Sequence, residues 1–166
     1  MKKTQQRDTA IGIIADTHGQ LREEAIAALQ GTEHIIHAGD IGSDGIVERL
    51  AAIAPVTAIR GNVDTGAWAT MYADTLRVDV AGLSIQVVHD LKESLTDPVA
   101  EGIDVVISGH SHKPHVYWQD DVLYVNPGSA GRRRFSLPVS LAILTLGPSG
   151  MTAQIHEIVQ RPNKAG

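Results

Sequence analysis

Apolar runs and helical patterns alternate along the first part of the chain. Short apolar runs predict buried strands over residues 10–15, 34–38 and 56–59. The two intervals between them carry apolar residues at helical spacing, namely Leu21, Ala25, Ile26 and Leu29 in the first and Ile46, Val47, Leu50 and Ile53 in the second. Ser43 or Asp44 is the expected N-cap of the second helix. This alternation favours parallel strands in an α/β sheet.

The second part of the chain has strand patterns and few helical ones. Residues 75–80 and 83–88 flank Ala81-Gly82, which indicates a hairpin. Further strands are expected over residues 104–107, 122–125, 140–146 and 151–159, the last two joined by a turn that contains glycine. We therefore expect a single domain over residues 1–166, with flexible ends at 1–9 and 161–166.

Five of the predicted strands end in side chains that commonly bind metal ions. These side chains are Asp16 and His18, Asp40, Asn62 and Asp64, His89, and His110 and His112. In open α/β sheets, the loops beyond the carboxyl ends of the strands lie together and form the binding site. Residues far apart in the sequence are therefore expected to meet in space.

Each cluster, taken alone, also fits an ordinary structural role. Asp16, Asp40 and Asn62 are typical of turns and caps. His89 could be a partly buried histidine with satisfied hydrogen bonds. The segment Gly109–His112, with the sequence GHSH, is the strongest single signal, because its glycine allows a sharp bend and its two imidazoles could serve adjacent ions. A single dinuclear metal site explains all the clusters at once, whereas the ordinary roles need a separate explanation at each strand end.

The composition limits the choice of metal. The chain has no cysteine, so thiolate ligands and disulfides are excluded, and a metal must bind to His, Asp, Glu or Asn. We expect two divalent ions per chain, with manganese as the first choice and iron, zinc or nickel as alternatives. Two ions roughly 3.5–4 Å apart can clamp a phosphate and hold a bridging hydroxide for in-line attack. Asp40, which is central in the series, is the candidate for the bridging carboxylate.

Charge and hydropathy argue against other classes of partner. The net charge is −5 and the pI is about 5.8, so a nucleic-acid polymer is not an expected partner. The first ten residues, MKKTQQRDTA, lack the apolar core of a secretory signal, and no apolar stretch is long enough to span a bilayer. We therefore expect a cytoplasmic protein with no membrane partner.

The ordered series of motifs closely resembles the calcineurin-like metallophosphoesterases. The matching motifs are Asp16-Thr17-His18, Gly39-Asp40, Gly61-Asn62, His89 and Gly109–His112. Their order and spacing resemble the small, single-domain phosphodiesterase branch of bacteria and archaea. The sequence NPGS at residues 126–129 is similar to a signature of the same branch. The resemblance runs from about Ile11 to Ser129 and continues loosely into the final strands.

The resemblance implies a fold, a ligand set and a reaction. The fold is a four-layer αββα sandwich of two mixed β-sheets flanked by helices. One metal is held by Asp16, His18, Asp40 and His112, and the other by Asp40, Asn62, His89 and His110. The implied catalytic residues are Asp40, Asn62 and His89, and Asn62 also contacts the substrate phosphate. The implied protein is a metal-dependent phosphodiesterase or phosphatase that acts on small phosphate esters and could form a homo-oligomer.

Two positions depart from the family pattern. Many larger members have a histidine after the asparagine, where it helps to protonate the leaving group, but Val63 cannot transfer a proton. Loss of one general acid typically costs roughly 10²–10⁴ in rate, so esters with good leaving groups should suffer least. His89 is followed by Asp90, where relatives often have glycine, and this difference falls next to the second metal.

Other polar residues have weaker claims to a place in the site. His115 could line the pocket and contact the substrate. Asp64 is expected to orient a neighbouring histidine without binding the metal itself. One of the arginines in Arg132–Arg134 could reach an anionic substrate, although such a run more often lies in a solvated loop. For His37, a packed or hydrogen-bonded role is expected.

A protein-binding scaffold is the alternative to an enzyme. A eukaryotic retromer subunit has the architecture implied here, but its site is degraded and it works through protein contacts. A scaffold without catalytic demand need not keep the ligand set. Because this chain has every ligand that the resemblance implies, the enzyme is the favoured interpretation.

Overall fold

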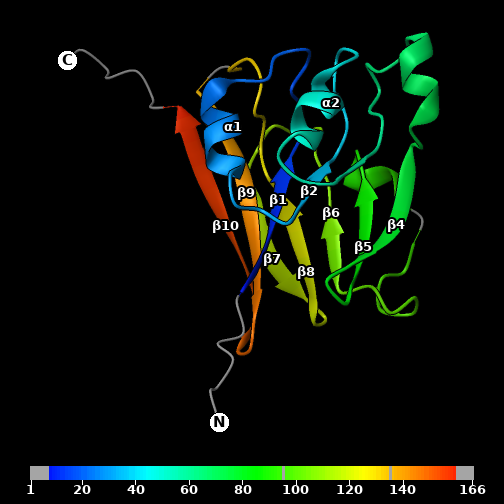
Figure 1. The fold of residues 1–166 in the computed structure, drawn as a ribbon. Coiled ribbons are helices and arrows are strands. Elements are labelled where there is room, and N and C mark those ends of the chain that lie inside the picture. The colour runs from blue at the N-terminus through cyan, green and yellow to red at the C-terminus, as the bar shows by residue number, and fades with distance from the viewer. Residues whose placement is uncertain (1–7, 95, 135, 160–166) are drawn as a thin grey trace.

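The computed structural model describes residues 8–94, 96–134 and 136–159, which build two β-sheets packed face to face (Figure 1). The first sheet has the strand order β10-β9-β1-β2-β3, and the second has the order β4-β5-β6-β8-β7. The strands of the first sheet are β1 (Thr9–Ile14), β2 (His34–His37), β3 (Val56–Ala58), β9 (Val139–Gly147) and β10 (Gly150–Val159). Those of the second are β4 (Thr75–Val80), β5 (Leu83–Val88), β6 (Val105–Ile107), β7 (His115–Gln119) and β8 (Val122–Asn126).

Both sheets are mixed, as predicted. In the first sheet β1, β2 and β3 are parallel, and β9 and β10 add antiparallel pairs at the other side of β1. In the second sheet β5, β6 and β8 are parallel, and β4 and β7 pair antiparallel at the two edges. Each sheet therefore places the carboxyl ends of several strands at one edge, where a site can form.

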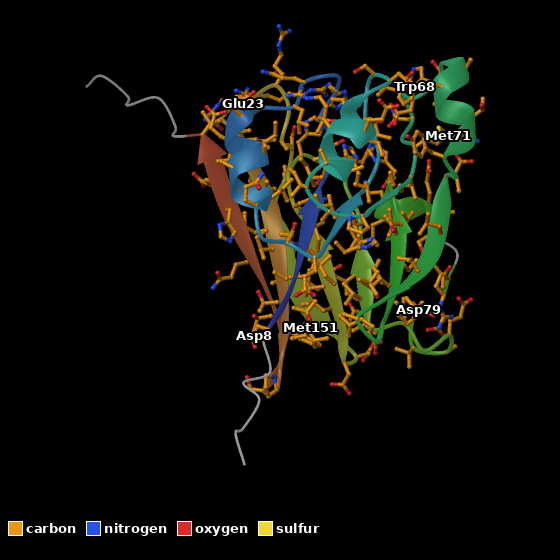
Figure 2. All side chains as sticks on the ribbon, viewed as in Figure 1. Asp8, Glu23, Trp68, Met71, Asp79 and Met151 are labelled. Atoms are coloured by element: carbon orange, nitrogen blue, oxygen red, sulfur yellow. The ribbon has the colours of Figure 1, made fainter. Side chains whose placement is uncertain are left out.

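An apolar core fills the space between the two sheets (Figure 2). Ile13 and Ile36 of the first sheet meet Ile85 and Ile107 of the second, and all four side chains are fully buried. Core residues that share a strand, such as Ile11 and Ile13 of β1, occupy alternate positions, so they lie on one face of the sheet. Removing this apolar surface from water holds the two sheets together and fixes the ends of their strands relative to each other.

Helices cover the outer face of the first sheet. They are α1 (Glu23–Leu29) and α2 (Ile46–Ala51), and two short 3₁₀ turns are η1 (Ala67–Met71) and η2 (Leu91–Glu93). Leu29 of α1 and Leu50 of α2 pack against Ile35 of β2. Over the second sheet the described residues contain no α-helix, and Ile103 of the β5–β6 connection packs on Val106. Among the helices that the structure describes, none has the length and apolar character needed to cross a membrane.

The predicted strands are present, with small shifts at their ends, and the sequence missed one strand and one cap. The missed strand is β7, which has the sequence HVYWQ. The N-cap of α2 is Gly45, in a left-handed conformation without a side-chain hydrogen bond, so the expected cap by Ser43 or Asp44 is wrong. Thr9 lies in β1, and residues 1–7 and 161–166 of the predicted flexible ends lie outside the described residues.

The parallel strands of both sheets finish at the same end of the molecule. In Figure 1 the arrowheads of β1, β5 and β6 point to that end. Trp68 and Met71 lie near it, whereas Asp8 and Asp79 lie at the opposite end (Figure 2). The loops after the strands of one sheet can therefore reach those of the other.

His37 is fully buried at the end of β2 and uses both of its ring nitrogens. The Gly39 N–H donates to its Nδ1 at 3.2 Å, so Nε2 carries the hydrogen of the neutral ring and donates to Thr17 Oγ1 at 3.0 Å. The Thr17 hydroxyl in turn donates to the Ile41 carbonyl. Burial lowers the pKa of His37 to about 4. The predicted hydrogen-bonded role is confirmed, and His37 joins the loops that follow β1 and β2.

The low pKa of His37 predicts that acid weakens the fold. The unfolded chain, with an ordinary histidine pKa of 6.5, binds more protons than the folded protein between pH 6.5 and about 4. The stability that neutral His37 contributes is therefore present above pH 6.5 and is lost as the pH falls toward 4. His37→Gln should reduce the fall in the free energy of unfolding over this range, measured by urea denaturation. His156→Gln, at an exposed position of β10, is the control and should behave like the wild type; identical pH profiles for H37Q and the wild type would contradict this role.

Candidate metal centre

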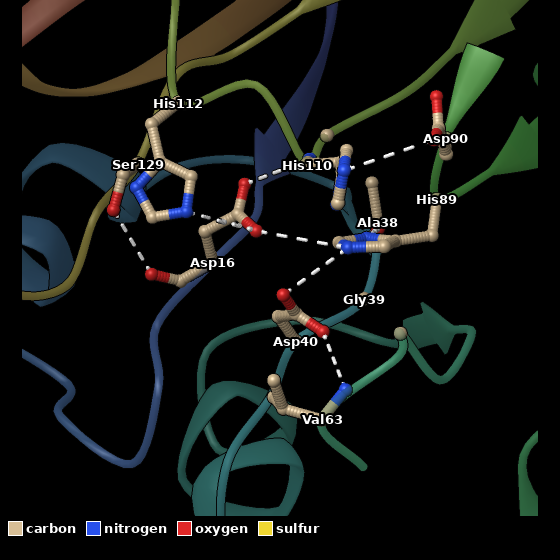
Figure 3. Close-up of polar contacts among 12 residues, drawn as sticks. Asp16, Ala38, Gly39, Asp40, Val63, His89, Asp90, His110, His112 and Ser129 are labelled. Atoms are coloured by element: carbon tan, nitrogen blue, oxygen red, sulfur yellow. Dashed lines mark hydrogen bonds and ion pairs between the residues drawn. The ribbon is translucent and has the colours of Figure 1, made fainter. Parts of the chain in front are cut away.

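Two groups of predicted ligands meet where the parallel strands end (Figure 3). Asp16, His18 and His112 form one group, and Asp40, His89 and His110 form the other. Within each group, one donor atom from each side chain lies within 4.8 Å of the others. Six side chains from the ends of both sheets are thus brought together, as the sequence predicts.

The two groups adjoin through their carboxylates. Asp40 Oδ2 lies 3.6 Å from His18 Nε2 of the first group and 3.2 Å from His89 Nε2 of its own group. Asp16 Oδ1 lies 3.6 Å from His112 Nε2 and 3.9 Å from His89 Nε2. Each of the two carboxylates therefore faces histidines of both groups.

Hydrogen bonds tie the loops of the two sheets together around Asp16. The backbone N–H of His110 donates to Asp16 Oδ2 at 3.1 Å, and Ser129 Oγ donates to the Asp16 carbonyl at 3.0 Å. The Asn126 amide donates to the Gly109 carbonyl at 3.0 Å. The NPGS segment therefore supports both the first aspartate and the histidine loop.

The ligand-bearing loops hold an uncommon backbone conformation. Five of the predicted ligands have positive φ angles, which are Asp16 (54°), His18 (47°), Asp40 (54°), His110 (71°) and His112 (61°). A left-handed conformation costs a residue with a side chain on the order of 1–3 kcal/mol and persists only where its surroundings fix it. Strain of this kind clusters at functional sites, and here it falls on the side chains that converge.

Two glycines allow the loops after β2 and β3 to touch. A Cβ atom at Gly61 would overlap the Asp40 side chain, and one at Gly39 would lie 2.7 Å from His89 Nδ1. Gly39 also has a φ of 96°, which glycine adopts without strain. The glycines of the Gly39-Asp40 and Gly61-Asn62 motifs are therefore needed for the close approach of the two groups.

Asp64 shapes these loops in a way that the sequence did not predict. Its carboxylate accepts the backbone N–H groups of Ile41 at 3.0 Å, Gly42 at 2.9 Å and Gly61 at 2.8 Å. Both oxygens are occupied by backbone donors, so the expectation that Asp64 orients a histidine ring is wrong. The carboxylate instead fixes the loop backbone on either side of Asp40.

The tautomer of His89 follows from its partners. Its Nδ1 lies 2.8 Å from the Ala38 carbonyl, which can only accept, so Nδ1 carries a hydrogen. In the neutral ring the lone pair is then on Nε2, which faces Asp40 and Asp16. Burial opposes a charge on this ring, but Asp40, the Ala38 carbonyl and Asp16 outweigh burial and raise the pKa of His89 to about 9. The surroundings of Nε2 therefore favour a positive charge.

The donor atoms of the site fit divalent cations. Among the described residues, the buried side-chain atoms without a hydrogen-bond partner include Asp16 Oδ1, His18 Nε2, His89 Nε2 and His112 Nδ1. Buried polar atoms without partners are costly and uncommon, and these four belong to the two ligand groups. Burial raises the pKa of Asp16 to about 7, and burial together with the charge of Arg134 lowers the pKa of His112 to about 4. Carboxylate and imidazole donors suit manganese, iron, zinc and nickel.

The remaining predicted residues line the approach to this centre. The exposed Asn62 lines a cavity of about 290 Å³ with Arg60, His89 and His110. His115 lines a second cavity, of about 450 Å³, on the other side of His110. His115 is not a member of either group of histidines and aspartates.

Three features near the centre were not specified by the sequence. The charge of Arg134, the last of the three arginines, acts on the pKa values of Asp16, His18 and His112. Asp90 Oδ2 lies 3.7 Å from His110 Nε2, so the residue that replaces a glycine of the family faces a predicted ligand. Val63 donates its N–H to Asp40 Oδ1 at 3.2 Å while its side chain is 45% exposed. The departures at positions 63 and 90 were the only sequence signals for the last two contacts.

Comparisons with known proteins agree with this geometry. The family model of the calcineurin-like phosphoesterase superfamily domain matches residues 10–148. A protein of Methanothermobacter thermautotrophicus named "Probable metallophosphoesterase" is 30% identical over 156 residues, which cover 87% of this chain and 90% of that protein.

Solved structures share the fold. The structure of a protein described as a novel archaeal phosphodiesterase matches with a TM-score of 0.73 and 26% identity, covering 89% of this chain and 100% of that one. Vacuolar protein sorting 29 from Cryptosporidium parvum matches with a TM-score of 0.72, covering 93% of this chain and 100% of that one, but at 16% identity this likeness shows the fold alone. On the extent of the family match and the identity to the archaeal relative, the chain belongs to the calcineurin-like phosphoesterase superfamily.

Proposed function

We propose that the protein is a phosphodiesterase that hydrolyses small phosphate esters with two divalent metal ions, manganese being the first choice. The observation that carries the proposal is the convergence of two groups of three predicted ligands, four of which have a buried side-chain atom without a hydrogen-bond partner. The membership of the superfamily and the similarity to a protein described as an archaeal phosphodiesterase support it.

The proposed ligands divide between the two ions. Asp16, His18 and His112 would hold the first ion, with Asp40 shared between the two. Asp40, His89 and His110 would hold the second, and Asn62 would complete it from the adjoining loop. When bound, ions held by these residues would supply a water acidic enough to act as the nucleophile and positive charge for the ester oxygens.

The chain's own residues then orient the substrate. Asn62, exposed at the wall of the cavity beside His89, is placed to donate its amide to a phosphate oxygen. Arg134 adds positive charge next to the first ligand group, which favours an anionic ester. The exposed Val63 side chain can neither give nor take a proton, so the leaving group must depart without help from this position. Substrates with acidic leaving groups are therefore favoured.

A scaffold function is the second candidate. It is favoured by the TM-score of 0.72 to vacuolar protein sorting 29, which is a likeness of fold. The complete ligand set favours the enzyme instead, because a scaffold does not need the strained loops and unpartnered donors found here. The two candidates differ in a simple assay, since only the enzyme hydrolyses a phosphodiester.

Binding of metal should stabilise the fold. A ligand that binds only the folded state at 100 times its dissociation constant adds about 2.7 kcal/mol to the free energy of unfolding. Manganese at that concentration should therefore raise the melting temperature of metal-free protein, measured by scanning calorimetry. His112→Ala should reduce this increase, whereas His156→Ala, at an exposed position of β10, should leave it unchanged. Equal increases for H112A and the wild type would show that His112 is no ligand.

Loading with manganese should also permit hydrolysis of bis-p-nitrophenyl phosphate. Loss of a residue that merely supports a metal ligand typically lowers metal affinity or activity by about 10–100-fold. Loss of a ligand shared by both ions should lower the activity by a larger factor. Asp40→Ala is therefore expected to lower kcat/KM by at least about a hundredfold, followed by release of nitrophenolate. Asp79→Ala, at the opposite end of the molecule, is the control and should keep wild-type activity (Figure 2). Complete inactivity of the wild type with every first-row divalent ion would overturn the proposal in favour of the scaffold.

A further inference from the structure

A second cavity adjoins the metal centre on the outer face of the second sheet. Its volume is about 450 Å³, within the range of about 300–1,000 Å³ typical of small-molecule sites. His110, a member of the second ligand group, forms part of its wall, as do Gly109 and Asp90. A substrate with its phosphorus atom at the metal centre can therefore place one ester group in this cavity.

One wall of the cavity is built from aromatic rings. Tyr117 of β7 and Tyr124 of β8 are direct partners across the two strands, and their rings stack at a centroid distance of 4.8 Å with an interplanar angle of 5°. His115, two residues before Tyr117 and so on the same face, has its ring 4.7 Å from the Tyr117 ring. The rings of His115, Tyr117 and Tyr124 therefore lie in a row, with the exposed His115 ring at one end.

Among the residues that line the same cavity, two lysines outnumber the one carboxylate, that of Asp90. Lys92 of η2 and Lys113, which follows the histidine loop, both line it. The chain as a whole has a net charge of −5, so two lysines at one cavity are a local exception. Amino groups at this place can donate to hydroxyl, carbonyl or phosphate oxygens of a bound ligand.

We propose that this cavity binds the nucleoside portion of a nucleotide phosphodiester, a substrate class that rests on the proposed phosphodiesterase function. A nucleobase has a flat aromatic face that can extend this row of rings by stacking on the exposed His115, and its edge and sugar have acceptors for Lys92 and Lys113. A long acyl chain would need an extended apolar groove, whereas the aromatic wall and the lysines suit a compact, polar and aromatic group.

Calorimetric titration of the manganese-loaded protein tests this assignment without relying on turnover. The probes are adenosine 5′-monophosphate and methyl phosphate, which share the phosphate and differ in the nucleoside. Stacking of one base is worth roughly 1–3 kcal/mol, so the nucleotide should bind about tenfold tighter or better than methyl phosphate. Tyr117→Ala should reduce this ratio of dissociation constants by about tenfold, and Tyr117→Phe should restore it because the ring is kept.

Two further variants serve as checks. Trp118→Ala removes the aromatic ring next to Tyr117 in the sequence, which lies on the opposite face of β7 and is 55% exposed, and it should leave the ratio unchanged. Tyr124→Leu removes the other stacked ring and should also lower the ratio, which covers the case in which Tyr117→Ala fails to fold. Equal affinities for both probes in the wild type, or a ratio that survives the loss of either tyrosine, would overturn the nucleoside assignment. That result would leave the phosphodiesterase proposal intact, since the latter fails only if no diester is hydrolysed.

Discussion

Two buried carboxylates, those of Asp16 and Asp40, lie where the two sheets meet, and the organisation of the site depends on the compensation of their negative charge. Burying charge without a partner is costly, and burial, reinforced by Asp40, raises the pKa of Asp16 to about 7. His89 meets both carboxylates through Nε2, and their charges contribute to a pKa of about 9 for its ring. The negative charge of Asp16 and Asp40 that favours a proton on His89 would also favour a divalent cation in its place.

The rest of the fold keeps these side chains in place. The apolar core between the sheets fixes the strands whose ends carry the ligands. Asp64 then holds the loops around Asp40 by three backbone N–H groups, and the His110 N–H holds Asp16. Such rigid support explains how five ligands keep positive φ angles that isolated loops would avoid. In the proposed enzyme, this rigidity supplies ready-made positions for two ions.

The sequence was informative where a pattern maps directly onto geometry. Apolar runs located the buried strands, and ligand-type residues after them located the convergence of Asp16, His18, His89 and their partners, because parallel strands end at one edge. It did not predict features that depend on contacts between distant parts of the chain. The strand β7 pairs with β8 at the edge of the second sheet, and the carboxylate of Asp64 accepts backbone N–H groups of a loop more than twenty positions away. The expected N-cap of α2 by Ser43 or Asp44 is wrong because the N-cap residue is Gly45, which has no side chain to accept a hydrogen bond.

The central claim is that two cations fit between these two groups of ligands, and anomalous diffraction from crystals of the manganese-loaded protein tests it most directly. The account predicts two manganese peaks per chain, one in contact with Asp16, His18 and His112 and the other with His89 and His110, with Asp40 between them. A single peak, or manganese bound elsewhere while these side chains turn away from one another, would contradict it.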